Sequence, residues 1–177
     1  MTADAAARGI AENSAQAVAD AVAAGAEFVE SDCHLTRDGV VVLFHDDNLQ
    51  RVLGDPRTLL QVDASELRAL MESRGGLITL EEALVRFPNT RFNIDVKADT
   101  AVQAVGPIVA SHAERVLLTA FSDARRRTAM AAIMRAGANQ RPAASPGTFT
   151  VVKLVIAVGL RARWLAARTL RGIDAVQ

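Results

Sequence analysis

Short apolar segments separated by polar ones recur along most of the chain, and their spacing predicts β-strands. Residues 91–97, Arg-Phe-Asn-Ile-Asp-Val-Lys, alternate as a half-buried strand does, whereas residues 40–44 form a continuous apolar run. Two further strands are predicted at residues 26–33 and 116–122. Helical segments lie between these strands, and this order is typical of a parallel α/β fold.

Capping residues and glycines mark the ends of the predicted helices. The first helix begins at Asn13 or Ser14 and ends at Gly25, and Thr79 to Glu82 form a capping box that begins a later one. The predicted helices cover residues 14–24, 63–70, 79–86, 100–113 and 123–135.

The segment between Asp32 and His45 is too short for a helical crossover between parallel strands. It has twelve residues, 33–44, and Asp38-Gly39 breaks it with turn chemistry. We therefore expect an extended excursion here. Residues 48–62, centred on Gly54-Asp55-Pro56, are expected to form a loop.

Residues 149–171 carry five basic side chains and no acidic one, and apolar residues occupy most of the helix circumference. Two interpretations follow. A helix of the fold that neighbouring elements cover is favoured, and a basic amphipathic helix on a membrane surface is the alternative. Residues 172–177 then resemble the beginning of a strand. No repeat or linker is visible, so residues 1–177 are predicted to form one domain.

Composition narrows the classes of partner and compartment. The chain has 20 basic and 20 acidic side chains, and this balance predicts no nucleic-acid partner. Cys33 is the only cysteine, so no intrachain disulfide forms, and we expect it in the core. The first nine residues do not have the pattern of a secretory signal, so a cytoplasmic location is expected. The longest apolar run, residues 149–160, is too short to span a bilayer.

Glu30 and Asp32 are the first candidates for chemistry. Residues two apart on a strand project from the same face, so both carboxylates point together. Such a pair suits a hard divalent cation such as Mg²⁺ or Ca²⁺. The alternative is a pair of exposed acids on a solvated strand.

His45 follows an apolar strand, at the end where barrel folds place their sites. An imidazole there can act as a general acid or base near neutral pH. The alternative is a structural histidine bonded to Asp46 or Asp47.

A second strand end and a helix start carry candidate phosphate ligands. Asp95 and Lys97 close the strand at residues 91–97 and offer an acid and a cation on one face, although such a pair is often a surface salt bridge. Arg8 lies just before the first helix, where a guanidinium suits a phosphate unless the terminus is disordered.

Taken in order, these segments resemble the glycerophosphodiester phosphodiesterase family. The family pattern is His-Arg-Gly, Glu-Asn-Thr, Glu-x-Asp, Lys/Arg-Asp-Gly, Phe-His-Asp and Glu-x-Lys. The corresponding segments are Ala7-Arg8-Gly9, Glu12-Asn13-Ser14, Glu30-Ser31-Asp32, Arg37-Asp38-Gly39, Phe44-His45-Asp46 and Asp95-Val96-Lys97. Residues 77–82 also resemble the family's Ile-Pro-Thr-Leu-Glu-Glu segment. The match covers residues 7 to 123.

The resemblance implies a TIM-type (β/α)8 barrel with its site at the carboxyl ends of the strands. It implies that this site hydrolyses glycerophosphodiesters to glycerol 3-phosphate and an alcohol. Carried onto this chain, it makes His45 one of two acid–base histidines. The implied metal ligands are Glu30, Asp32 and Asp95, with Mg²⁺ or Ca²⁺ as the metal, and the implied phosphate ligands are Arg8 and Lys97.

Three departures from the family pattern bear on activity. Ala7 occupies the position of the other catalytic histidine, and His34, which alternates with Asp32, is the nearest replacement. Asp95 stands in place of the family's glutamate. The family's later Trp-Thr-Val-Asn and Asp-Gly-Ile strands are absent from the sequence, and no apolar strand precedes Arg8.

A barrel of this type needs about 250 residues. The 177-residue chain is therefore expected to form an incomplete barrel, truncated at the C-terminus, with its first and last strands missing or degenerate. Open strand edges predict poor solubility or an oligomer that covers them. The alternative to an enzyme is a non-catalytic relative that binds phosphodiesters or membrane headgroups, or an inactive fragment.

Overall fold

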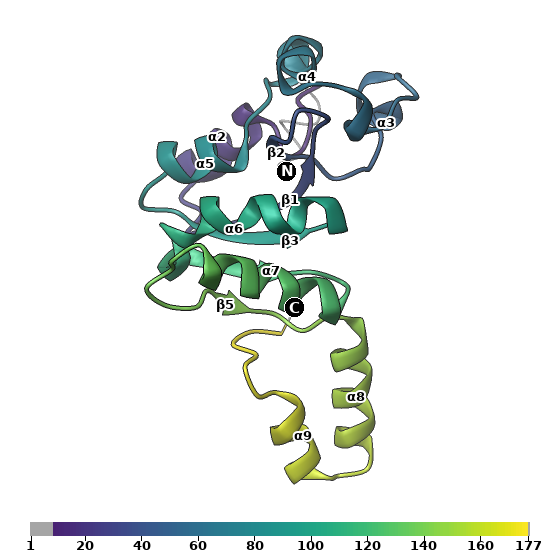
Figure 1. The fold of residues 1–177 in the computed structure, drawn as a ribbon, viewed down its shortest axis with the longest axis vertical. Helices are drawn as coiled ribbons and strands as arrows, with labels where there is room; N and C mark the ends of the chain where they lie inside the picture. Colours follow the sequence, from purple (N-terminus) through teal and green to yellow (C-terminus); the bar gives the residue numbers. More distant parts are fainter. Residues whose placement is uncertain (1–8, 177) are drawn as a thin grey trace.

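The computed structural model describes residues 9–176 as a mixed α/β fold built on one five-stranded sheet (Figure 1). The strands are β1 (Phe28–Leu35), β2 (Val41–Leu43), β3 (Arg91–Val96), β4 (Val116–Thr119) and β5 (Ala143–Ala144). The α-helices are α2 (Ala15–Ala23), α3 (Gln50–Leu53), α4 (Ala64–Met71), α5 (Leu80–Arg86), α6 (Val102–Ala110), α7 (Asp123–Arg135), α8 (Thr148–Gly159) and α9 (Arg163–Thr169). Short 3-10 turns occupy Leu59–Gln61, Glu72–Arg74, Asp99–Ala101 and Ala113–Arg115.

The sheet order is β2-β1-β3-β4-β5, and the four strands β1, β3, β4 and β5 run parallel. β2 is antiparallel to β1 and pairs with only its last three residues, so the extended excursion predicted between Asp32 and His45 is confirmed. Within residues 9–176, β2 and β5 form the two edges of the sheet, which therefore stays open in this part of the chain.

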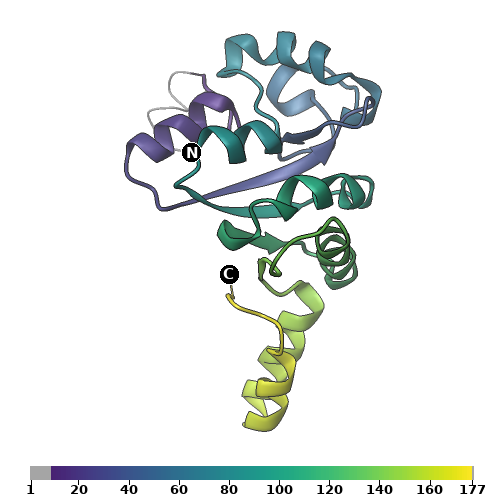
Figure 2. The ribbon, with the colours of Figure 1, turned by 60° about the vertical axis from the view of Figure 1, so that its left-hand side comes forward.

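Helices α5, α6 and α7 cover one face of the sheet, and the opposite face is open (Figures 1 and 2). The main core lies between these helices and the strands and includes Phe92, Ile94 and Leu118, each fully buried. Cys33 belongs to this core, as predicted. A second, smaller cluster around Phe44 and Leu67 packs beneath the excursion that follows β1.

Several helices begin at the capping residues that the sequence predicted. Ser14 caps α2 by accepting a hydrogen bond from the Ala17 N–H, and Thr79 and Glu82 complete the capping box of α5. α7 spans the predicted residues 123–135. Gly106 is tolerated inside α6 because a Cβ there would lie 2.9 Å from the Ala132 backbone of α7, so the glycine allows the two helices to pack closely.

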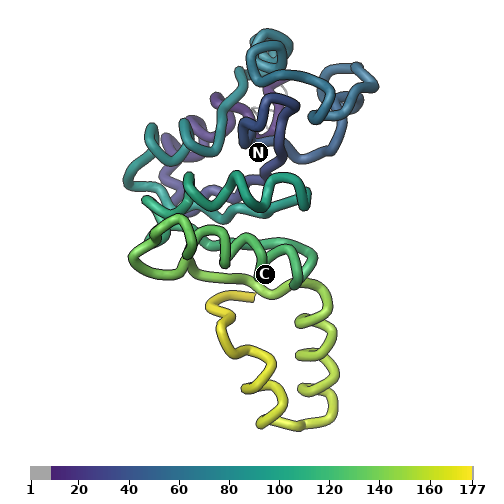
Figure 3. Tube along the Cα trace, in the orientation of Figure 1, coloured from purple at the N-terminus to yellow at the C-terminus, as the bar shows by residue number. Residues whose placement is uncertain are grey.

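Three predictions of local structure are wrong. Residues 48–62 contain α3 and a 3-10 turn as well as loop. The predicted covered helix at residues 149–171 is instead two helices, α8 and α9, that project from the body (Figures 1 and 3). Most of their apolar side chains are exposed. The structure assigns no strand at residues 172–176, where the N–H groups of Asp174 and Ala175 both donate to the Ala144 carbonyl.

α8 is anchored by a carboxylate from another helix. Asp123, the first residue of α7, accepts hydrogen bonds from the Gly147 N–H at 3.1 Å, the Thr150 N–H at 3.0 Å and the Thr150 hydroxyl at 2.8 Å. A Cβ at Gly147 would lie 2.7 Å from the Asp123 nitrogen, so only glycine permits this approach. Asp123 thus satisfies N–H groups at the start of α8 that have no partner within that helix.

Replacing Asp123 by Ala should lower the free energy of unfolding by about 1.5–3 kcal/mol, because hydrogen bonds to a buried charged group are lost. Burial raises the pKa of Asp123, but the bonds from Thr150, Gly147 and Arg126 outweigh it and lower the pKa below its usual value. The stabilisation is therefore present above the unfolded pKa and is lost as pH falls through the lower folded pKa. Chemical denaturation across acidic pH measures it, and Asp99→Ala, an exposed site, should have little effect.

No helix in residues 9–176 combines the length and apolar character needed to cross a membrane.

Candidate active site on the open face of the sheet

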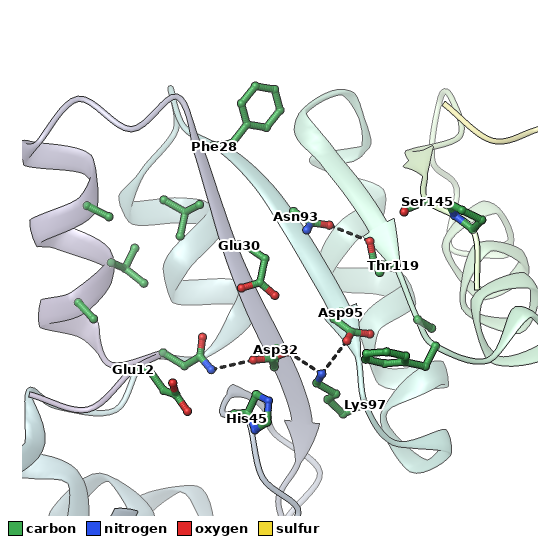
Figure 4. Close-up of a pocket in the computed structure, with 18 of the residues that line it drawn as sticks. Glu12, Phe28, Glu30, Asp32, His45, Asn93, Asp95, Lys97, Thr119 and Ser145 are labelled. Carbon is green, nitrogen blue, oxygen red and sulfur yellow. Dashed lines mark hydrogen bonds and ion pairs between the residues drawn. The ribbon is translucent and has the colours of Figure 1, made fainter. Parts of the chain in front are cut away.

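The predicted acidic residues meet on the open face of the sheet because β1 and β3 pair in register. Asp32 lies opposite Asp95, and Glu30 lies opposite Asn93. Figure 4 shows the carboxylates of Glu30, Asp32 and Asp95 on this face, with the helices behind the sheet. Asp32 and Asp95 are buried, each 5% exposed, whereas Glu30 reaches solvent through the opening. The interpretation of Asp32 as an exposed acid on a solvated strand is therefore wrong.

Lys97 joins the two buried carboxylates. Its ammonium lies 3.0 Å from Asp32 Oδ1 and 2.8 Å from Asp95 Oδ2 (Figure 4). Burial lowers the pKa of Lys97, but the hydrogen bonds to Asp95 and Asp32 outweigh it, so the pKa is raised and the ammonium stays charged. The Lys97 side chain is only 19% exposed, so the pair is not a surface salt bridge.

One carboxylate oxygen of this cluster has no partner. Among the described residues, Asp95 Oδ1 is buried without a hydrogen bond. A buried acceptor without a donor costs free energy, and a cation would relieve that cost. No three His, Cys, Asp or Glu side chains in residues 9–176 are already gathered as a metal site. The donor chemistry nevertheless fits a hard divalent cation, because carboxylate oxygens are its preferred ligands.

The protein around Glu30 raises the pKa of this carboxyl by desolvation, and the neighbouring Asp32 charge raises it further. The cluster therefore holds more negative charge than Lys97 alone compensates, since three carboxylates face one ammonium. A divalent cation would restore the balance.

Asn13 is a site residue to which the sequence analysis assigned no role in the site, although it is a candidate helix cap and part of the segment that resembles the family's Glu-Asn-Thr. Its side-chain amide donates to Asp32 Oδ2 at 3.1 Å, and its amide oxygen accepts from the Ser31 hydroxyl at 2.6 Å. The backbone of Asn13 has a φ of 58°, a left-handed conformation that asparagine tolerates better than most residues. Asn13 thus fixes the Asp32 carboxylate from the helix side.

His45 lines the same cavity and is oriented by a chain of charges. Its Nδ1 lies 2.6 Å from Asp46 Oδ1, and Arg51 Nε donates to Asp46 Oδ2 at 2.7 Å. Arg51 also pairs with Glu12. The Arg51 bond lowers the pKa of Asp46, so Asp46 is an ionised acceptor and His45 Nδ1 carries the proton. Nε2 is then the nitrogen that can take or give a proton, so the bond to Asp46 supports the functional interpretation as well as the structural one.

Replacing Asp46 by Asn should reduce any turnover that depends on His45, because the amide can donate to Nδ1 and favour the wrong tautomer. The expected result is a change in the pH profile of kcat as well as a lower kcat, with KM little altered. Asp47→Asn, the neighbouring acid, is the matched control. An Asp46→Asn variant with an unchanged pH profile would contradict this role.

His34 does not replace a second catalytic histidine in this arrangement. It is 6% exposed, and its Nε2 hydrogen bonds with the His45 carbonyl at 3.1 Å. Because a carbonyl only accepts, Nε2 carries the proton and is already used. Burial lowers the pKa of His34, which favours this neutral form.

The cluster forms one end of a cavity of about 860 Å³ on the open face. Glu30, Asp32, His45, Asp95 and Lys97 all line it. The remaining wall is mostly apolar, with Phe28, Phe121 and residues of α2 and α8, and it also includes the polar residues Asn93, Thr119 and Ser145. Five of the six predicted site residues are therefore brought together, while Arg8, like Ala7, lies outside the described residues.

Comparison with known proteins identifies the family of this chain. The sequence model of the glycerophosphoryl diester phosphodiesterase family matches residues 4–164, which is most of the chain. The chain belongs to this family. The resemblance inferred from the spaced motifs is thus confirmed, and the match continues beyond residue 123 into α8 and α9.

Relatives of similar sequence are named as phosphodiesterases or lysophospholipases D. A probable glycerophosphodiester phosphodiesterase 2 of Mycobacterium tuberculosis is 34% identical over 168 residues, which cover 93% of this chain and 62% of the relative. A lysophospholipase D of Homo sapiens is 37% identical over 105 residues, which cover 51% of this chain and 33% of the relative. The chain thus spans less than two thirds of the length of either relative.

Solved structures of the family share the fold. The glycerophosphoryl diester phosphodiesterase domain of a Mycobacterium tuberculosis protein aligns with a TM-score of 0.69 at 19% identity, covering 88% of this chain and 62% of that domain. An Oleispira antarctica phosphodiesterase, solved with the product sn-glycerol-3-phosphate, aligns with a TM-score of 0.64 at 18% identity, covering 95% of this chain and 87% of that one. These neighbours are TIM-barrel proteins, so the predicted fold class is confirmed.

Proposed function

We propose that this chain binds glycerophosphodiesters on the open face of its sheet and hydrolyses them to glycerol 3-phosphate and an alcohol. One observation carries the proposal. The Lys97 ammonium bridges two buried carboxylates, beside an unpaired Asp95 oxygen, in a cavity that His45 also lines. A phosphodiester carries concentrated negative charge and a poor leaving group, and this arrangement supplies a fixed cation and an acid–base group in one place.

The carboxylates are the proposed ligands of a catalytic metal ion. Glu30, Asp32 and Asp95 would hold Mg²⁺ or Ca²⁺, which when bound acts as a Lewis acid on the phosphoryl oxygens. The unpaired Asp95 Oδ1 and the excess of carboxylates over Lys97 support this assignment. Asp95, one methylene shorter than the family's glutamate, already lies within hydrogen-bonding distance of Lys97.

The remaining side chains bind the substrate and move protons. Lys97 uses two of its three donors on Asp32 and Asp95 and has one left for a phosphoryl oxygen. Arg8 is proposed as a second phosphate ligand on the family pattern. Nε2 of His45 would transfer a proton at the reacting oxygens as water adds to phosphorus and the bond to the alcohol breaks. Ala7 leaves the second proton transfer to solvent, so turnover is expected to be slow.

Choline release from glycerophosphocholine, or ethanolamine release from glycerophosphoethanolamine, tests this function. The 177-residue chain should release alcohol in the presence of Mg²⁺ or Ca²⁺, and this release should stop when the cation is chelated. Asp95→Asn should abolish release, whereas Asp99→Asn, an exposed aspartate nearby in sequence, should not. Release that is equal in the Asp95→Asn variant would show that another site or a contaminant is responsible.

A further inference from the structure

The helical hairpin, residues 148–171, exposes a large apolar surface. Ala157 is the only residue of α8 that is buried, and no residue of α9 is. Val155 is 65% exposed, and Leu160 and Trp164 are each 71% exposed. Figures 1 and 2 show the hairpin extending away from the sheet and its covering helices. An exposed apolar surface of this kind marks a contact with another phase or molecule.

The apolar residues of α8 are ordered along the helix. Phe149, Val152, Ile156 and Leu160 follow one another at spacings of three, four and four, which places them on one face. All four are exposed. In a helix that covers a core, this stripe would be the buried one. Here the stripe is exposed, and the helix is fixed to the body at its first turn, where Gly147 and Thr150 donate to Asp123.

The charged side chains of the same hairpin are all basic. Residues 124–173 contain no Asp or Glu, although the whole chain has as many acidic as basic side chains. Exposed Arg161, Arg163, Arg168 and Arg171 flank Trp164, and the ammonium of Lys153 lies 4.3 Å from the centre of the Phe149 ring. The surface therefore combines apolar side chains, an exposed indole and unopposed positive charge.

A second copy of the chain does not match this surface. A two-fold dimer through the hairpin would place the same patch on both sides, and the hairpin has no acid to oppose its own arginines. An anionic lipid surface does match, because it takes apolar side chains and indole at its boundary and basic side chains at its headgroups. We propose that residues 148–171 dock the chain onto anionic lipid surfaces.

Docking through the hairpin would bring the candidate active site to the lipid. Thr148, Val151 and Val152 of α8 line the cavity, and Val152 belongs to the exposed stripe as well. The lipid contact and the cavity wall therefore share one helix. The docking itself does not depend on catalysis, so it can be tested without measuring turnover.

Trp164 is the only tryptophan of the chain and provides the readout. The 177-residue chain should co-sediment with phosphatidylcholine vesicles that contain phosphatidylglycerol, and Trp164 emission should shift to shorter wavelength. Pure phosphatidylcholine vesicles should bind much less, and added salt should weaken binding because the attraction is partly electrostatic.

Paired charge reversals locate the contact. Arg168→Glu with Arg171→Glu should reduce partitioning to the anionic vesicles by about tenfold or more. Arg86→Glu with Arg127→Glu makes the same change in net charge at exposed sites of α5 and α7 and should reduce it far less. Equal losses in the two variants would overturn the proposal. So would absent binding at low salt, or a dimer in which Trp164 emission is already at short wavelength without vesicles.

Discussion

Replacing Ala7 by His should raise the rate of glycerophosphodiester hydrolysis by about 10²–10⁴, the usual contribution of one positioned acid–base group. Ala7 occupies the position where the family pattern has its other histidine, and His34 cannot serve instead because its Nε2 is bonded to the His45 carbonyl. Alcohol release at saturating substrate measures the effect in kcat.

Ala7→Asn is the matched control, because asparagine has a similar size and polarity but does not titrate. It should leave the rate near that of the unaltered chain. A folded Ala7→His variant that binds metal yet shows no gain would contradict the acid–base account. That result would favour the alternative of a non-catalytic relative that binds phosphodiesters.

Replacing Lys97 by Met should lower the free energy of unfolding by about 3–5 kcal/mol, because it leaves Asp32 and Asp95 as buried charges without their counter-ion. A divalent cation should recover part of this loss, since it would supply the missing positive charge. Chemical denaturation with and without Mg²⁺ or Ca²⁺ measures both effects.

The chain offers a close control for this change. Lys153 is its only other lysine and is exposed on α8, so Lys153→Met should change stability little and should not alter the response to metal. Stability losses of similar size in the two variants would show that the Lys97 ion pairs contribute nothing specific. If divalent cations do not change the free energy of unfolding of the Lys97→Met variant, the support for a metal at the carboxylates is removed.

The parts of the fold that local sequence determines were predictable. Helix caps act within one turn, as the capping box at Thr79 and Glu82 does for α5 and the Ser122 side chain does for α7. These two helices therefore begin where the pattern places them. The carboxylates of the site were also predictable, because side-chain alternation on β1 and β3 fixes the face on which they lie. Their proximity then follows from the pairing of two parallel strands.

Other features depend on contacts between distant residues, which periodicity does not reveal. α3 has four residues, too few to show a helical period. α8 and α9 are divided at Arg161, which adopts a φ of 54° although it is not a glycine, so the left-handed residue lies two positions beyond the nearest sequence signal, Gly159. The bond from Asn13 to Asp32 spans 19 positions, and the unpaired oxygen of Asp95 exists only once the surrounding core has packed.

Calorimetric titration of the 177-residue chain with Mg²⁺ or Ca²⁺ tests the central claim most directly. The claim is that the carboxylates on the open face form a cation site beside Lys97 and His45. It predicts one binding event in the unaltered chain and in Asp99→Asn, its loss in Asp95→Asn, and tighter binding of sn-glycerol 3-phosphate when the cation is present. Identical titrations for the unaltered chain and Asp95→Asn would contradict it.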